Sequence, residues 1–197
     1  MNQNDKTGIR LIEAVQKGNP SAFEQFVEQY KRLIYHIVLR MIPNETDCED
    51  VCQDIFLKII QNLSGFRHES KVSTWIAKIA YNQCLNYLKK KRVKLVDDCL
   101  PGEIHSGSID TESLAPDAYI QNRDIRERLH DMIDQLPVHF RIALTLFHLE
   151  DMHYNEIAYI MNLPVGTVKS YLFRARKSLR KNLENHYLRE EIWIEST

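Results

Sequence analysis

Cysteine, glycine and proline are all scarce in this chain of 197 residues, with four, six and six copies. Four cysteines are too few to crosslink a chain of this length, and no early segment combines a basic start, an apolar stretch and a small-residue cleavage site. We therefore expect reduced thiols and a cytoplasmic location. No apolar run approaches the roughly 20 residues that span a bilayer, which argues against direct membrane insertion.

Neither sign of charge dominates, because 26 lysines and arginines face 27 aspartates and glutamates. The net charge of -1 excludes a whole-chain attraction to nucleic acid or anionic lipid, so any such attraction must be local. The charge is uneven along the chain: residues 1–92 carry 14 bases and 10 acids, whereas residues 93–125 carry two bases and seven acids. That second stretch, with its interspersed prolines and glycines, is typical of an acidic linker between two modules.

Apolar residues recur at intervals of three and four along most of the chain, and no segment alternates with a period of two. We therefore predict an all-α fold with two small helical domains joined by a flexible acidic linker, whose cores a hydrophobic content of 44% can fill. Helices are expected over residues 20–43, 46–63, 73–92, 126–136, 140–147, 155–161 and 165–183. The expected boundaries are 1–93 and 122–184 for the domains, 94–121 for the linker and 185–197 for a tail.

Capping residues mark the starts of the first two predicted helices. Asn19 can cap the first, and Pro20 suits its first helical position. Thr46 and Glu49 have the spacing of a reciprocal capping box, in which each side chain accepts a backbone N–H of the other residue. We therefore expect the second helix to be capped by Thr46.

The last two predicted helices have the spacing of a helix-turn-helix. The short helix is followed by a turn at residues 162–164 and by a longer helix with six bases and no acid outside its apolar stripe. In such a motif the second helix enters the major groove, with its early residues at base edges and its later residues at phosphates. The early candidates are Thr167, Lys169, Ser170, Phe173 and Arg174, and the later ones are Arg176, Lys177, Arg180 and Lys181. The alternative is a solvated basic helix end, which the helix dipole favours.

Residues 66–94 interleave aromatic and basic side chains. Phe66, Trp75, Tyr81 and Tyr87 alternate with Arg67, Lys71, Lys78 and the basic run at residues 89–92. Such a mixture suits single-stranded nucleic acid, whose bases stack on rings while cations follow the backbone. Core packing is the preferred interpretation for Trp75, which shares a face with Ile76 and Ile79, and the basic run by itself is equally typical of a solvated helix end.

Catalysis has no visible site in this sequence. No glycine-rich phosphate loop, nucleophile elbow or zinc-protease motif is present, and Cys48 and Cys52 lack the spacing of known metal ligands despite eight histidines. We expect no enzyme activity, no metal and no cofactor. What the helix from residue 46 does offer is a polar face, with Glu49, Asp50, Gln53, Asp54 and Lys58 outside its apolar stripe, which could dock on a basic helix of another protein.

Three segments in this order resemble a known family. They are TDCEDVCQDIFLK at 46–58, STWIAKIAYNQCLNYLKKKR at 73–92 and LPVGTVKSYLFRAR at 163–176. From about residue 18 to residue 183 the chain resembles the extracytoplasmic-function group of bacterial sigma factors in the sigma-70 family. The resemblance implies a region 2 domain that docks on the polymerase clamp and melts the minus-10 element, a linker, and a region 4 domain that recognises the minus-35 element.

The resemblance also implies partners and site residues: core RNA polymerase, promoter DNA that is duplex at minus-35 and melted at minus-10, and no catalytic group. Polymerase binding is assigned to Asp47, Asp50, Gln53, Asp54 and Lys58. Minus-10 binding is assigned to Phe66, Arg67, Lys71, Lys78, Asn82, Lys89, Lys90 and Arg92. Minus-35 binding is assigned to Thr167, Lys169, Ser170, Tyr171, Phe173, Arg174, Arg176, Lys177 and Lys181.

The chain departs from the family pattern at two positions. Tyr171 stands where the family commonly has arginine, and His153 stands where serine or threonine would cap the first helix of the helix-turn-helix. Members of the family are often held inactive by an anti-sigma protein anchored in the membrane, so the resemblance implies such a partner here.

Two other functions compete with this interpretation. A self-sufficient helix-turn-helix regulator would need a dimerisation element, and no heptad seam is visible. An enzyme with a cysteine and histidine metal centre would carry bound metal when purified. The near-neutral charge favours the sigma factor, because two modest basic faces bind duplex DNA weakly unless a large partner holds both.

Overall fold

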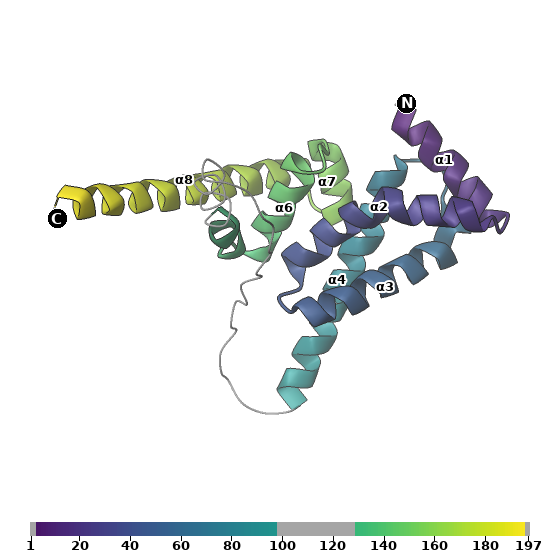
Figure 1. Cartoon of the computed structure of the whole chain (residues 1–197), viewed down its shortest axis with the longest axis horizontal. Helices are drawn as coiled ribbons and strands as arrows, with labels where there is room; N and C mark the ends of the chain where they lie inside the picture. The colour runs from purple at the N-terminus through teal and green to yellow at the C-terminus, as the bar shows by residue number, and fades with distance from the viewer. Residues whose placement is uncertain (1–2, 98–128, 196–197) are drawn as a thin grey trace, which may run out of the picture.

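The structure is a computed structural model that describes the backbone of residues 3–97 and 129–195 and the side chains of residues 6–91 and 129–184. Every regular element within these ranges is a helix, which confirms the predicted all-α fold (Figure 1). Of the expected linker, 94–121, only residues 94–97 are described. No helix in the described ranges combines the length and the apolar content that crossing a bilayer requires.

The N-terminal module is built around α2, which packs against its other three α-helices. Its elements are α1 (Gln3–Gln16), α2 (Pro20–Met41), α3 (Glu45–Asn62), the 3-10 turn η1 (Leu63–Gly65) and α4 (Val72–Asp97). The buried side chains that α2 supplies, among them Phe26, Ile34 and Ile37, follow the helical period, and α3 and α4 bury Ile55, Ile59 and Ile76 against them. Helices α3 and α4 thus pack around α2, which lies at the centre of this core.

Helix α1 was not expected from the sequence. It is held by the buried Ile12 and by the close approach of Gly8 to α2. A Cβ atom at position 8 would clash with the Tyr30 hydroxyl, so any larger residue would force the Tyr30 side chain of α2 to shift. The sequence signal for this helix is the periodic spacing of Ile9, Ile12 and Val15, which the interior Gly8 weakens.

The start of α2 agrees with its predicted cap, whereas the start of α3 does not. Asn19 accepts a hydrogen bond from the backbone N–H of Ala22 at 3.2 Å, and Pro20 occupies the first helical position. Helix α3 begins at Glu45, and its cap is Asn44, whose side chain accepts from the N–H of Asp47 at 3.3 Å. The predicted cap at Thr46 is therefore wrong: asparagine is as good a cap as threonine, and it lies two residues earlier.

The C-terminal module contains the helix-turn-helix. Residues 129–134 are helical, and they are followed by α6 (Val138–His148), α7 (Tyr154–Met161) and α8 (Val165–Glu195). Asn162 adopts a left-handed conformation, with φ of 54°, and ends α7 so that the chain turns into α8 as predicted. At the start of α7, Glu156 compensates for the missing serine or threonine, because its Oε2 accepts from the backbone N–H of His153 at 2.9 Å.

Two helices are longer than predicted. Helix α4 continues from residue 92 to Asp97, into the stretch assigned to the linker, and α8 continues from residue 183 to Glu195, through most of the stretch assigned to a tail. Neither extension contains proline or glycine. Nothing in either extension therefore interrupts the helical backbone.

The two modules pack against each other. Helix α6 lies against α2, and α7 lies against α4, as Figure 1 shows for the green and the blue to teal helices. Buried side chains of both modules, such as Ile37 and Ile142, belong to one continuous hydrophobic cluster. The arrangement therefore brings the helix-turn-helix onto the N-terminal module.

Candidate nucleic-acid interface

The exposed face of α8 carries a row of cations. Val168, Leu172 and Ala175 are buried against α6 and α7, and the opposite face is left to solvent. The exposed side chains there are Lys169, Ser170, Phe173, Arg174, Arg176, Lys177 and Lys181. Within the described residues, Arg174, Lys177 and Lys181 make no hydrogen bond or ion pair to the chain, so their charge is available to a ligand.

Three predicted minus-35 residues are less available. Tyr171 is half-buried, with its ring centroid 4.7 Å from that of His139 and 5.4 Å from that of Phe140. Position 171 borders the buried stripe of α8, so one side of the ring packs on α6 while part of it stays exposed, and its assignment to the minus-35 DNA stays a prediction. Thr167 is also half-buried, and the Ser170 hydroxyl donates to the Gly166 carbonyl at 3.0 Å.

A pair of aromatic rings lies beside two further cations of α8, Lys169 and Arg176. The rings of Phe147 and Tyr154 stack with 5.1 Å between centroids and 10° between planes. Lys169 Nζ lies 5.7 Å from the Tyr154 centroid, and Arg176 Cζ lies 5.2 Å from the Phe147 centroid. Both cations remain exposed, so the rings orient them without removing them from solvent.

The loop before α4 presents fewer predicted minus-10 residues than expected. Phe66 is only 8% exposed, and its ring lies 5.3 Å from that of Trp75, so it packs in the core of this DNA-free form and its contact with DNA stays a prediction. The packing interpretation of Trp75 agrees with this contact. Arg67, Asn82, Lys89 and Lys90 are exposed, and the side chain of Arg92 lies outside the described residues.

Helix α7 contacts the two remaining minus-10 residues, Lys71 just before α4 and Lys78 on α4. Glu156 Oε1 accepts from the Thr74 hydroxyl at 2.8 Å and pairs with Lys71 Nζ at 3.0 Å. Lys78 Nζ donates to the Tyr159 carbonyl at 2.6 Å and lies 5.2 Å from the centre of its ring. Two cations assigned to DNA are therefore engaged by the helix-turn-helix module itself.

The carboxylate of Glu156 is stabilised in its charged form. Burial by itself would raise its pKa, but hydrogen bonds from the His153 N–H, Lys71 and Thr74 outweigh burial and lower the pKa. Burial lowers the pKa of Lys78. Thr74 is 2% exposed, so its hydroxyl depends on Glu156 for a partner.

A second polar contact joins α2 to the start of the C-terminal module. Arg40 is 5% exposed, and its guanidinium bonds Asp134 Oδ1 at 2.7 Å and His130 Nδ1 at 2.8 Å. Nearby, His36 Nδ1 lies 2.6 Å from Glu150 Oε1. Periodicity could not reveal these contacts, because their partners are far apart in sequence; the only local signal is an arginine inside the apolar pattern of α2.

The exposed face of α3 matches the predicted polymerase-docking face with one exception and one addition. Asp50, Gln53, Asp54 and Lys58 are exposed, but Asp47 is paired with Lys91 Nζ of α4 at 2.8 Å, which lowers the pKa of Asp47. This face also carries a residue absent from the prediction, Leu57, which is 57% exposed. The missed signal was a leucine off the buried stripe of its helix.

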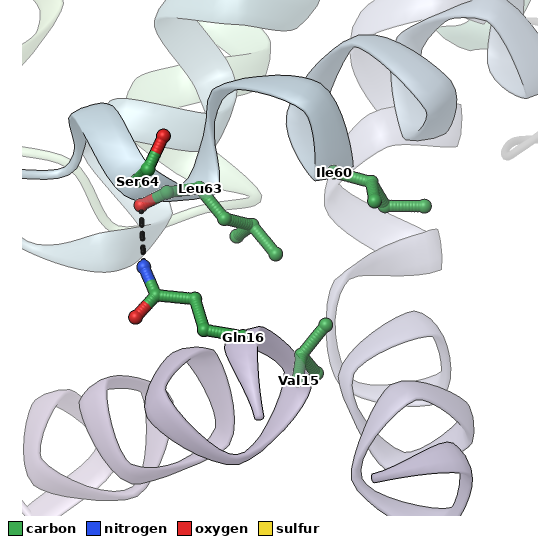
Figure 2. A pocket seen from close by; sticks show the side chains of 5 residues that line it. All are labelled: Val15, Gln16, Ile60, Leu63 and Ser64. Carbon is green, nitrogen blue, oxygen red and sulfur yellow. Dashed lines mark hydrogen bonds between the residues drawn. The ribbon is translucent and has the colours of Figure 1, made fainter. Parts of the chain in front are cut away.

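A small groove separates α1 from the end of α3. Figure 2 shows its lining, in which Gln16 Nε2 donates to the Leu63 carbonyl at 2.9 Å across the groove. Val15 and Ile60 supply its apolar wall. The contact anchors α1 beside the 3-10 turn.

The three cysteines that the structure describes are shielded from solvent, Cys48 and Cys84 fully and Cys52 in part. Burial raises the pKa of Cys52 to about 11 and that of Cys84 to about 12, and it also raises the pKa of Cys48. These thiols are therefore protonated at neutral pH. Among the side chains that the structure describes, no three of the metal-ligating types gather into a group that could hold a metal ion.

Comparison with known families matches both modules. Residues 26–93 match the family described as Sigma-70 region 2, and residues 126–179 match the family described as Sigma-70, region 4. The first match covers α2 to α4, and the second covers the helix-turn-helix. The two family matches leave out residues 94–125 between the modules.

Two curated relatives are similar over most of the chain. The ECF RNA polymerase sigma-E factor of Escherichia coli K12 is 35% identical over 178 residues, covering 88% of this chain and 93% of the relative. The RNA polymerase sigma-H factor of Pseudomonas aeruginosa PAO1 is 33% identical over 179 residues, covering 89% and 93%.

Two solved structures share the fold at 20% sequence identity. CnrH, in complex with the cytosolic domain of CnrY, aligns with a TM-score of 0.63 over 91% of this chain and 98% of that one. The sigma factor RpoE from Bartonella quintana, in complex with the anti-sigma factor NepR, aligns with a TM-score of 0.64 over 82% and 96%. The relatives and the two matched regions together decide against an enzyme and against a self-sufficient regulator. The chain belongs to the extracytoplasmic-function group of sigma-70 family sigma factors, which bind core RNA polymerase and direct it to promoters.

Proposed function

We propose that the exposed face of α8 binds the minus-35 element as duplex DNA. The observation that carries this proposal is the row of Arg174, Lys177 and Lys181, which have no partner within the described part of the chain. Free cations on the second helix of a helix-turn-helix suit phosphates and guanine edges. Phe173, which is 66% exposed, adds an apolar group suited to a thymine methyl.

Core polymerase is assigned to the exposed face of α3. Asp50, Gln53 and Asp54 supply acidic and polar groups for a basic helix of the partner. Leu57 supplies the apolar centre that a protein interface needs, because binding energy concentrates in desolvated central contacts. Asp47 contributes to this face indirectly, by its ion pair with α4.

The melted minus-10 element is assigned to the loop at residues 66–71 and to α4. Arg67, Asn82, Lys89 and Lys90 are exposed on this side of the N-terminal module. Lys71 and Lys78 must exchange their contacts with α7 for contacts with DNA. The compact arrangement is therefore the DNA-free form, and minus-10 binding requires α7 to leave α4.

An anti-sigma protein is the proposed regulator, and the cytoplasm is the proposed location. The two similar structures are complexes, one with the cytosolic domain of CnrY and the other with the anti-sigma factor NepR. A shared fold gives a regulator of this kind a comparable surface here. Polymerase and promoter DNA are both found in the cytoplasm.

Run-off transcription on a promoter library tests these assignments. Core polymerase is supplied with the full chain, with Arg174→Ala, or with Arg10→Ala, an exposed base of α1 far from the proposed face. We expect promoter-specific transcripts that require the chain, a changed minus-35 preference for Arg174→Ala, and wild-type behaviour for Arg10→Ala. An unchanged minus-35 preference in the Arg174 variant would remove α8 from the proposal.

A further inference from the structure

The stacked rings of Phe147 and Tyr154 lie at the edge of the hydrophobic core, packed against it on one side. Both are partly buried, one at the end of α6 and the other at the start of α7, and they lie beside the exposed face of α8. The stack brings together the two ends of the connection between α6 and α7. Among the described side chains, the cations that contact these two rings are Lys169, on Tyr154, and Arg176, on Phe147.

The two cations share one face of α8. They are seven residues apart, which is close to two helical turns and about 10 Å along the axis. Arg176 is further held by His148, whose Nε2 lies 3.3 Å from Nη2. Burial and the neighbouring guanidinium lower the pKa of His148, which keeps this imidazole neutral and able to accept.

We propose that Phe147 and Tyr154 are positioning residues that orient Arg176 and Lys169 toward the phosphates of the minus-35 DNA. The inference rests on the proposed function of α8. A ring attracts a cation to its face without neutralising its charge, so the cation still attracts a phosphate. Arg180 offers the contrast, because its partner at 2.7 Å is the Glu184 carboxylate, which cancels its charge.

Orientation before binding raises affinity. Lysine and arginine side chains are long and flexible, and they lose conformational freedom when a phosphate fixes them. A side chain that is already confined loses less freedom, so binding is stronger for the same contacts. The two rings would therefore strengthen DNA binding without touching DNA.

A double-mutant cycle tests the inference. The full chain, bound to core polymerase, is titrated onto duplex promoter DNA at several salt concentrations for wild type, Tyr154→Leu, Lys169→Met and the double variant. We expect Tyr154→Leu to weaken binding about 2- to 5-fold, the range of an exposed cation–π contact. Lys169→Met should weaken binding and lower the salt slope by about one, and adding Tyr154→Leu to it should cost nothing more.

Two controls separate positioning from folding. Tyr154→Phe keeps a ring and should keep the affinity, and Tyr154→Leu combined with Lys181→Ala should be additive, because no described ring lies at Lys181. Thermal unfolding and polymerase binding are measured for each variant. If leucine at 154 unfolds the module, the equivalent cycle of Phe147→Leu with Arg176→Met replaces it.

Each outcome is decisive. Additive effects of Tyr154→Leu and Lys169→Met, or tighter DNA binding by Tyr154→Leu, would overturn the inference, the second by showing that ring and phosphate compete. If Lys169→Met and Lys181→Ala both leave affinity and salt slope unchanged, α8 does not contact the DNA, and it is the proposed function that fails.

Discussion

Glu156 accepts a hydrogen bond from Thr74 at 2.8 Å, although the two residues are 82 positions apart and belong to different modules. The same carboxylate binds the backbone at the start of α7 and pairs with Lys71. The Glu156 side chain thus caps α7 of region 4. It also holds α7 against α4 of region 2, the helix proposed to bind the minus-10 DNA. Closure of the modules and access to that DNA are therefore coupled.

Glu156→Gln should open the compact form. The variant removes the negative charge that pairs with Lys71 and weakens the hydrogen bonds from Thr74 and the His153 N–H. We expect a loss of about 1–2 kcal/mol in the free energy of unfolding. The Glu156 carboxylate is largely shielded from solvent, but Lys71 is exposed, so solvent weakens their ion pair. Denaturant unfolding measures the loss, and small-angle scattering should detect a larger radius of gyration. Glu28→Gln, at an exposed acid of α2, is the matched control; equal behaviour of both variants would contradict the coupling.

Acid should weaken the contact between α2 and the C-terminal module through His130. Burial and the adjacent Arg40 lower the pKa of His130 below its ordinary value of 6.5, against the opposing effect of Asp134 and Asp131. A histidine with a depressed pKa stabilises the fold while it is neutral, so its contribution is complete above pH 6.5 and is lost as pH falls through the folded-state pKa.

His130→Gln checks this pH dependence. Unfolding free energies of wild type and variant are compared across the range below pH 6.5. We expect the difference between them to shrink or reverse on acidification, because glutamine does not become charged. The exposed His68 supplies the control variant His68→Gln. A difference independent of pH would show that protonation of His130 does not affect folding.

The α3 face should bind polymerase without supporting the fold. Replacing Asp50 and Gln53 with alanine is expected to weaken co-purification with core polymerase while changing the unfolding free energy by no more than ~0.5 kcal/mol, as for most surface substitutions. Leu57→Ser should weaken co-purification similarly, because it removes the apolar centre of the face. Glu24→Ala, at an exposed acid of α2, is the control. Unchanged polymerase binding in all variants would exclude α3 as the docking face.

Arg174 and Lys181 should differ in the kind of DNA contact they make. Arg174→Ala is expected to lose roughly 1–3 kcal/mol on the preferred minus-35 sequence and little on a scrambled one, because it lies where base edges are reached. Lys181→Ala should weaken both sequences alike and reduce the salt slope by about one, as for a phosphate contact. Salt titrations of the polymerase-bound chain on both elements distinguish the two. Equal losses on both sequences for Arg174→Ala would make it an electrostatic anchor.

Local sequence signals determined much of this protein. The spacing of apolar residues predicted the helices, Asn19 and Pro20 marked the start of α2, and the turn at Asn162 located the helix-turn-helix. These features depend on neighbours within a few residues, which the sequence states directly. The motifs at 46–58, 73–92 and 163–176 carried the family resemblance, and the comparisons confirmed it.

The errors arose where local signals compete. Asn44 and Thr46 are both good caps, and the choice between them depends on where the preceding chain leaves α2. Phe66 and Tyr171 are aromatic residues in functional motifs, where a ring can stack on a base or pack on a neighbour. Only the positions of Trp75, His139 and Phe140 decide which neighbours these rings contact, with Phe66 buried and Tyr171 half-buried.

By itself the sequence determined helices, modules and family, because each depends on periodicity or on a motif of adjacent residues. Tertiary structure alone decided which predicted DNA-binding groups are free. Arg174, Lys177 and Lys181 have no partner in the described residues, whereas Lys71 and Lys78 are engaged by α7. The physical reason is distance along the chain: Glu156 and Thr74 meet through packing of the modules, and no local pattern encodes which distant side chain will satisfy a buried hydroxyl.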